Sequence, residues 1–221
     1  MNPDSLNGML RAGVARMGLS LGDDAITRLL DYQALLARWN AAYNLTAVRD
    51  PREMVTRHLL DSLAILPHVH GATLADLGSG AGLPGIPLAI AMPELQVLLV
   101  DANGKKVRFL REAIRTLKLD NAQAVQARVE ALGGQFDCIT SRAFASLGDM
   151  LAWAGHLLGP DGIWLALKGR MPTAELESLP PAFSLRATHA LTVPGLDAER
   201  HLLVLVRSRA DRQDRASGML T

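Results

Sequence analysis

The sequence has a single cysteine, few aromatic residues, no long apolar run and almost no net charge. One cysteine, Cys138, cannot form an internal disulfide, and such usage is typical of a buried thiol in the reducing cytosol. No apolar run approaches the length of a membrane-spanning helix, and the N-terminus lacks the charged-then-apolar pattern of a signal peptide. We therefore expect a cytoplasmic globular protein without a membrane anchor. Because the formal net charge is only +1, any surface for nucleic acid must be a local basic cluster.

A glycine-rich segment is the most informative motif of the chain. Gly78-Ser-Gly-Ala-Gly-Leu-Pro-Gly85 follows one short apolar run and precedes another, an order that predicts a strand, a turn and a helix. Glycines allow positive φ and let the backbone approach a ligand closely. Asp101 ends the next apolar run, and a carboxylate about 20 residues after a glycine turn usually accepts hydrogen bonds from ribose hydroxyls. The segment therefore predicts a site for a nucleoside-bearing cofactor that includes Gly80 and Asp101.

Two classes of cofactor fit this turn. Gly80-Ala-Gly-Leu-Pro-Gly85 matches the pattern G-x-G-x-x-G, so an NAD-dependent oxidoreductase is an alternative. Asp76, however, lies within the predicted strand, where a dinucleotide site usually has apolar residues. Pro84 and Pro87 also remove N–H groups that would bind a pyrophosphate. A carboxylate would instead stabilise the cationic sulfonium and amino-acid end of S-adenosylmethionine, which these residues favour. A non-catalytic RNA-binding module is a further alternative.

The 221 residues predict a helical extension, an α/β domain and a polar tail. Residues 1–70 carry apolar side chains at helical spacing, residues 71–207 alternate between strands and helices, and 208–221 are polar. Two helix starts are predicted in the extension, a capping box at Ser20-x-x-Asp23 and an acidic N-cap followed by proline at Asp50-Pro51. The polar segment 40–49 between these helices is predicted as a connection. We expect the protein to be a monomer.

The strand pattern predicts an α/β fold. Strands are expected at about 73–77, 96–100, 122–126, 136–140 and 163–167, with helices between them, so the sheet is parallel and covered on both faces. The last two strands, Phe183–Leu191 and His201–Arg207, leave no room for a crossover helix and predict an antiparallel hairpin. A Rossmann-like sheet that ends in this way is the seven-stranded sheet of methyltransferases rather than a dinucleotide-binding sheet.

Polar residues at the ends of the predicted strands are candidates for ligand binding, because the ligand of a doubly wound sheet lies at the carboxyl ends of its strands. Glu130 follows the third strand, where an acid can bind an adenine amino group. Arg142 follows the fourth strand, and an arginine there must find a carboxylate, a phosphate or water. Lys168 and Arg170 follow the fifth strand.

The segment 104–119 predicts an amphipathic helix with a basic face. Lys105, Arg108 and Arg115 lie opposite its apolar stripe. Such a face is commonly no more than a solvated surface. Together with the basic residues after the fifth strand, it predicts a phosphate-binding rim for RNA that consists of Lys105, Arg108, Lys168 and Arg170. Phe144 is the aromatic candidate for stacking on a base.

The histidines do not predict a catalytic or metal site. His58, Asp61 and Ser62 share one helix face, and this spacing favours a hydrogen-bonded contact between the extension and the α/β domain. His68 and His70 have no third ligand at suitable spacing, so we expect no metal site.

Several segments between Trp39 and Lys168 together carry a resemblance to a known family. They are Trp39-Asn40, Tyr43-Asn-Leu-Thr46, His58-Leu-Leu-Asp-Ser-Leu63, Asp76-Leu-Gly-Ser-Gly-Ala-Gly-Leu-Pro-Gly-Ile-Pro-Leu-Ala89, Lys105-Lys106 with Phe109-Leu110, Arg128-Val-Glu130, Ser141-Arg-Ala-Phe144 and Lys168-Gly169. Only the glycine–proline segment is specific by itself. In this order, the segments resemble the bacterial ribosomal RNA small subunit methyltransferase G family, formerly glucose-inhibited division protein B.

The resemblance implies a class I methyltransferase fold with an N-terminal helical extension. It also implies transfer of a methyl group from S-adenosylmethionine to N7 of a guanine in the 530 loop of 16S ribosomal RNA, with the small ribosomal subunit or its precursor as partner. The family's cofactor positions fall here on Gly78, Leu83, Val129, Glu130 and Arg142. Because guanine N7 has an unprotonated lone pair, no general base is needed, and we expect positioning rather than a catalytic acid–base residue.

Overall fold

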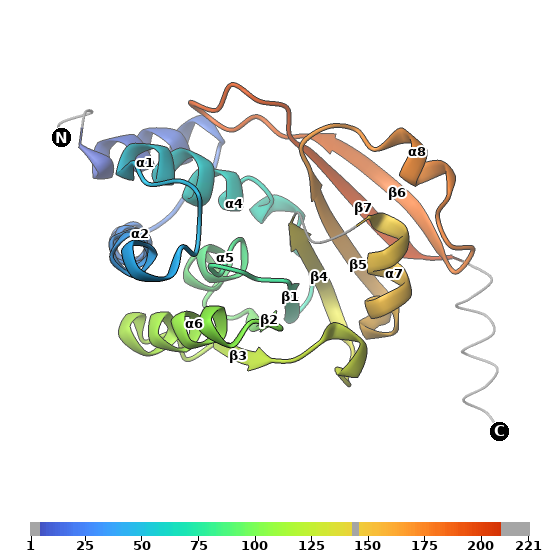
Figure 1. The fold of residues 1–221 in the computed structure, drawn as a ribbon. Coiled ribbons are helices and arrows are strands. Elements are labelled where there is room, and N and C mark those ends of the chain that lie inside the picture. The colour runs from blue at the N-terminus through green and yellow to red at the C-terminus, as the bar shows by residue number, and fades with distance from the viewer. Residues whose placement is uncertain (1–4, 143–145, 209–221) are drawn as a thin grey trace.

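A seven-stranded sheet forms the centre of the computed structural model, which describes residues 5–142 and 146–208 (Figure 1). The strand order is β3-β2-β1-β4-β5-β7-β6, and the strands are β1 (Thr73–Leu77), β2 (Gln96–Asp101), β3 (Ala122–Gln126), β4 (Phe136–Arg142), β5 (Leu158–Lys168), β6 (Phe183–Ala190) and β7 (His201–Arg207). Strands β1 to β5 pair in parallel, and β7 pairs antiparallel with both β5 and β6. The predicted parallel sheet with an antiparallel C-terminal hairpin is therefore confirmed.

Strand β5 is longer than predicted, since it begins at Leu158 rather than at 163. Leu158 pairs with Phe136 of β4 across an irregularity in the register. Cβ atoms built on Gly159 and Gly162 would lie 3.1 and 2.8 Å from the Phe136 carbonyl oxygen, so these glycines allow the two strands to approach. By itself the sequence Gly-Pro-Asp-Gly predicts a turn, and pairing with β4 overrides that local preference.

Helices cover both faces of the sheet (Figure 1). They are α1 (Leu6–Arg16), α2 (Asp23–Tyr43), α3 (Pro51–Met54), α4 (Asp61–Leu63), α5 (Gly85–Ala91), α6 (Gly104–Leu117), α7 (Leu147–Ala154) and α8 (Thr173–Glu177), with a π-helical turn at Val55–Leu60 and 3₁₀ turns at Leu66–His68, Val129–Ala131 and Gly155–Leu157. Helices α1, α2, α4, α5 and α6 share one hydrophobic cluster on one face of the sheet, and α7 packs into a second cluster on the other face. The basic helix predicted at 104–119 is confirmed as α6, although it ends at Leu117.

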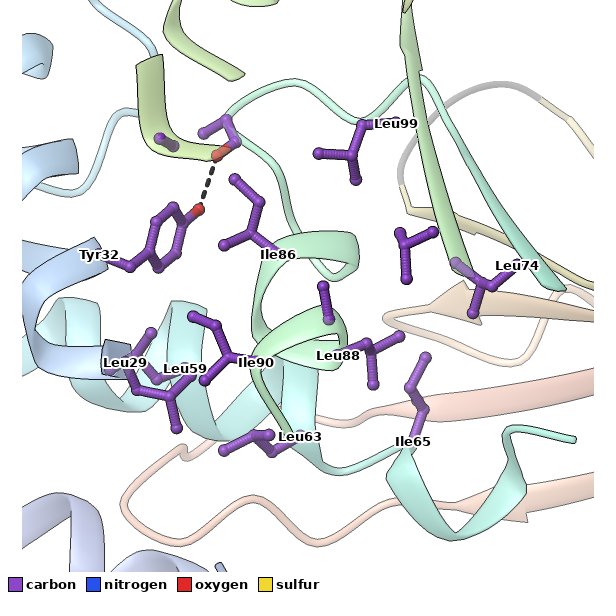
Figure 2. Packing of buried hydrophobic residues seen from close by; sticks show 14 of the residues in the cluster. Leu29, Tyr32, Leu59, Leu63, Ile65, Leu74, Ile86, Leu88, Ile90 and Leu99 are labelled. Carbon is purple, nitrogen blue, oxygen red and sulfur yellow. Dashed lines mark hydrogen bonds between the residues drawn. The ribbon is translucent and has the colours of Figure 1, made fainter. Parts of the chain in front are cut away.

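The helical extension packs into the same core as one face of the sheet. Leu29 of α2 and Leu59 of the π-helical turn lie beside Ile90 of α5 in this cluster (Figure 2), and all three side chains are buried. Burial of one such aliphatic side chain stabilises a fold by about 1.5–3 kcal/mol. Apolar contacts therefore hold the extension against α5, the helix that follows the glycine turn.

Helix α3 begins as predicted, whereas α2 does not. The Asp50 carboxylate accepts hydrogen bonds from the backbone N–H groups of Arg52 at 2.7 Å and Glu53 at 3.0 Å, and Pro51 takes the first helical position. The capping box predicted at Ser20 is wrong, because the extended residue Gly22 directly precedes α2 and no side chain of the described residues caps that helix.

Helix α2 also continues to Tyr43, so the connection predicted at 40–49 begins too early. Asn40 in the last turns is only 2% exposed, although it is polar. Its side chain accepts a hydrogen bond from the Thr46 N–H at 2.9 Å and donates one to the Val48 carbonyl at 3.3 Å. The segment that follows α2 therefore supplies hydrogen-bond partners for both the oxygen and the nitrogen of the Asn40 side chain, so this polar side chain can be buried.

Within the described residues, no helix has both the length and the apolar character that crossing a membrane would require. The base-stacking candidate Phe144 and the tail residues 209–221 lie outside the described residues, so the predictions made for them stay predictions.

Candidate functional site

A cavity of about 400 Å³ lies at the carboxyl ends of β1, β2 and β3. Its volume is in the range of small-molecule sites. Four of the seven residues predicted to bind cofactor line it, namely Gly78, Asp101, Val129 and Glu130. The other three, Gly80, Leu83 and Arg142, do not line it. The remaining lining residues are Val100, Ala102, Lys106, Ala127, Arg128 and Trp153.

The glycine turn beside this cavity depends on positive φ. Gly78, Gly80 and Gly82 have φ angles of 68°, 61° and 90°, a region that side-chain-bearing residues rarely adopt. The Ser79 N–H donates to the Val100 carbonyl at 2.9 Å, and the Gly82 N–H donates to the Ser79 carbonyl at 2.8 Å. The turn is therefore anchored to β2, and Gly80 has the positive φ that glycine allows.

Asp101 connects β2 to the glycine turn. One carboxylate oxygen accepts a hydrogen bond from the Gly80 N–H at 3.0 Å and lies 3.6 Å from the Lys106 ammonium. The other oxygen accepts from the Asn103 N–H at 2.8 Å. Each carboxylate oxygen has more than one lone pair, so Asp101 retains acceptor capacity toward the cavity that it lines. This arrangement fits a ligand that presents ribose hydroxyls.

Asp76 lies beneath the turn and is fully buried. Its Oδ2 accepts hydrogen bonds from the Ser79 hydroxyl at 2.6 Å and from the Gly85 N–H at 3.0 Å, so it holds both ends of the turn. Burial raises the pKa of this carboxyl to about 6, against the opposing effect of these two hydrogen bonds. Its Oδ1 has no hydrogen-bond partner among the described residues. Asp76 does not line the cavity, so its observed role is to hold the turn.

Arg142 finds the carboxylate that its position requires, on the helical extension. Its guanidinium lies 3.0 Å from Asp61 Oδ2 and donates to the Arg57 carbonyl at 3.1 Å. The other oxygen of Asp61 accepts from Arg200, which precedes β7, at 2.9 Å. The predicted contact between the extension and the α/β domain is therefore confirmed for Asp61. Ser62 does not take part, since its hydroxyl oxygen has no hydrogen-bond partner among the described residues. His58 of the same helix face pairs with the Thr46 hydroxyl at 2.9 Å, and burial lowers the pKa of this histidine.

The residues of the predicted basic rim differ in their surroundings. Lys105 and Arg108 are exposed at the start of α6, directly beside the cavity-lining Lys106. Arg170 is exposed after β5. The Lys168 ammonium instead lies 3.0 Å from the Glu175 carboxylate of α8 and is largely buried, so its charge is partly compensated within the protein.

Sequence reasoning missed Trp153 as a residue of the cavity. It lines the cavity from α7 and is 41% exposed. The buried residues of α7 are Leu147, Met150, Leu151 and Ala154, and Trp153 stands outside this stripe. A large apolar ring on the solvent side of a helix was the available signal. Lys106 was also missed as a partner of Asp101, although the two residues are only five positions apart and the short connection from β2 to α6 brings them together.

Comparison with known proteins agrees with this geometry. The model of the rRNA small subunit methyltransferase G family matches residues 25–203. A protein of Xanthomonas campestris pv. campestris (strain 8004) named ribosomal RNA small subunit methyltransferase G is 56% identical over 188 residues, which cover 84% of this chain and 89% of the relative. A protein of the same name from Stenotrophomonas maltophilia (strain K279a) is 54% identical, with coverages of 92% and 96%.

Solved structures agree at the level of the fold. A TehB-like SAM-dependent methyltransferase from Corynebacterium glutamicum superposes with a TM-score of 0.55 at 18% identity, over 71% of this chain and 94% of that chain. At this identity the likeness concerns the fold alone. With the family model covering most of the chain and relatives above half identity, the chain belongs to the rRNA small subunit methyltransferase G family.

Proposed function

We propose that this chain transfers a methyl group from S-adenosylmethionine to N7 of a guanine in the 530 loop of 16S ribosomal RNA. Membership of a family described as rRNA small subunit methyltransferases supports the reaction class and the kind of RNA. The observation that carries the cofactor assignment is the cavity formed by Gly78 and Asp101, in which the Asp101 carboxylate also holds the left-handed Gly80 through its N–H.

Residues around this cavity match the parts of S-adenosylmethionine. Asp101 would accept hydrogen bonds from the ribose hydroxyls, and Glu130 would accept one from the adenine amino group, with the buried Val129 against the ring. Asp76, buried beneath the turn, would contribute negative charge behind the cationic methionine end without contacting it. Gly78 lets the backbone approach because no Cβ intervenes. Leu83 and Arg142 do not line the cavity, and we assign them to this site only on the resemblance of their positions to those of the family.

The methyl transfer requires the side chains mainly to position the two reactants, and it requires no proton transfer by a side chain. When bound, S-adenosylmethionine supplies a methyl group on a positively charged sulfur. Guanine N7 attacks with a lone pair that carries no proton, so the protein needs no general base at this atom. The glycine turn, Asp101 and Arg142 would align N7, the methyl carbon and the sulfur, and such alignment supplies several kcal/mol of rate acceleration.

Basic side chains near the cavity would bind the RNA backbone. Lys105, Arg108 and Arg170 are exposed, and Lys168 could join them by exchanging its Glu175 partner for a phosphate. We propose that the protein acts in the cytoplasm as a monomer on the small ribosomal subunit or its precursor.

Methyl transfer from labelled S-adenosylmethionine is the direct test. The purified chain should label 16S ribosomal RNA at a guanine N7, and Asp101→Ala should lose cofactor affinity by about 1–3 kcal/mol, the cost of leaving polar partners unmatched. Calorimetry with S-adenosylhomocysteine and with NADH separates this function from an oxidoreductase, and RNA binding without label would indicate a non-catalytic module. Comparison of naked RNA, an assembly intermediate and the finished subunit identifies the substrate particle.

A further inference from the structure

A tyrosine of the helical extension holds the carbonyl at the centre of the glycine turn. The Tyr32 hydroxyl of α2 donates a hydrogen bond to the Ala81 carbonyl at 2.6 Å (Figure 2). Tyr32 is fully buried, although its partner lies in the α/β part of the chain. Ala81 stands between Gly80 and Gly82, both of which have positive φ.

The hydroxyl is a fixed and permanent donor. Burial, and next the negative charge of Asp76, raise the pKa of Tyr32 above its ordinary value, so the phenol keeps its proton at physiological pH. Its ring packs against Phe109 of α6, with ring centroids 6.4 Å apart. The ring therefore has little freedom to move the hydroxyl away from the turn.

The other anchors of the turn come from the sheet, and Tyr32 acts from the opposite side. Ser79 bonds to Val100, and Gly80 bonds to Asp101, both on β2. These contacts hold the first half of the turn, and Asp76 of β1 holds its last residue, Gly85. The flanking glycines allow the Ala81–Gly82 peptide group several orientations. Its N–H is held by the Ser79 carbonyl at 2.8 Å, and its carbonyl oxygen needs a second contact to fix the other end of the group. Tyr32 supplies that contact.

We propose that Tyr32 is a positioning residue that keeps the glycine turn in its cofactor-binding conformation. This role rests on the proposed function, because it assumes that the turn binds S-adenosylmethionine. A turn that samples other conformations binds more weakly, in proportion to the fraction of molecules in the competent state. The helical extension then contributes to the cofactor site as well as packing on the sheet.

The variant Tyr32→Phe removes the hydroxyl and keeps the ring. We expect its Kd for S-adenosylhomocysteine, measured by calorimetry, to rise about tenfold, the usual scale for removing a buried hydrogen bond. The KM for S-adenosylmethionine should rise similarly, whereas kcat at saturating cofactor should stay near that of the wild type, because binding restores the turn. A purely structural role of the hydroxyl would not produce this separation of KM from kcat.

Leu29→Val is the matched control. Leu29 lies on the same helix, is buried in the same cluster and lies beside Leu59 and Ile90 (Figure 2). It has no hydroxyl with which to bind the turn. It should lower the thermal midpoint without changing the Kd. Hydrogen exchange of the wild type provides a second measurement that needs no variant: the Gly82 amide, bonded to the Ser79 carbonyl, should be protected even without cofactor.

Two results would overturn the role of Tyr32. One is a Kd for Tyr32→Phe within twofold of the wild type, and the other is free exchange of the Gly82 amide before cofactor is added. If the wild type itself does not bind S-adenosylhomocysteine, the proposed function fails first, and the role of Tyr32 fails with it.

Discussion

The Asp61 carboxylate lies 3.0 Å from the Arg142 guanidinium, and this pair joins the helical extension to the end of β4. Asp61 is 1% exposed, and Arg200 occupies its other oxygen at 2.9 Å. Two cations thus share one buried carboxylate. Such an arrangement is sensitive to loss of the central charge, because both arginines would then lose the counter-ion that they share.

Asp61→Asn should lower the free energy of unfolding by about 3 kcal/mol, the scale for breaking a buried ion pair. It should also lower methyl-transfer kcat/KM, because Arg142 loses the partner that orients it. Chemical denaturation and the methylation assay measure the two effects. In a double-mutant cycle, Asp61→Asn should cost little further activity in an Arg142→Gln background. Additive losses would show that Asp61 does not act through Arg142, and Asp31→Asn, at an exposed site on α2, is the control without effect.

Gly80→Val should abolish measurable cofactor binding. The φ of Gly80 is 61°, and a Cβ there would meet nothing closer than the Gly78 carbonyl oxygen at 3.8 Å, so the cost is backbone strain rather than a clash. Gly18→Val is a matched control, since Gly18 has φ 70° and open space around it, far from the turn. Both variants should lose a similar few degrees of thermal midpoint, but only Gly80→Val should lose affinity in calorimetry. Retained binding would remove this turn from the site.

Neutralising Lys105 and Arg108 together should reduce the salt dependence of RNA binding. Removal of one ionic interaction with a phosphate lowers the slope of log affinity against log salt by about 0.7–0.9. The measurement is RNA binding by the Lys105→Gln and Arg108→Gln double variant at several salt concentrations, with S-adenosylhomocysteine affinity expected to stay constant. Arg186→Gln on β6, also exposed, controls for a general loss of charge. An unchanged slope would mean that this face of α6 is only solvated.

The buried carboxyl of Asp76 should make stability fall as pH rises from about 4 to about 6. Its folded pKa is about 6 and its ordinary value is 3.8, so in this window the folded protein binds a proton that the unfolded chain has released. The unfolding free energy therefore decreases with pH, by about 3 kcal/mol in total for this group. Asp76→Asn should remove this contribution.

Denaturant unfolding of wild type and Asp76→Asn at several pH values measures the difference between their slopes. His58, whose pKa is lowered by burial, contributes with the opposite sign. Because His58 is present in both proteins, its effect cancels in the comparison. Parallel pH profiles of the two proteins would contradict the raised pKa.

Local chemistry explains why much of the fold and part of the site were predictable. The left-handed backbone at Gly80 follows from the absence of a Cβ, and the start of α3 follows from the Asp50 carboxylate followed by proline. The alternation of apolar runs predicted the sheet, and positions at the strand ends predicted that Asp101 and Glu130 line one cavity. In the length of β5, pairing with β4 prevailed over the local turn preference. At Ser20 the capping signal failed because α2 begins only after Gly22.

By itself, the sequence determined the class of fold, the turn and the residue types at the carboxyl ends of the strands, because these depend on backbone preferences and periodicity. Only the tertiary structure decided which partners those residues have: Asp61 for Arg142, Glu175 for Lys168 and Tyr32 for the Ala81 carbonyl. It also decided that Trp153 lines the cavity. The physical reason is that the chemical type of a charged group or hydrogen-bond donor fixes only the class of partner that it can bind. Which distant group comes within about 3 Å depends on how helices and strands pack.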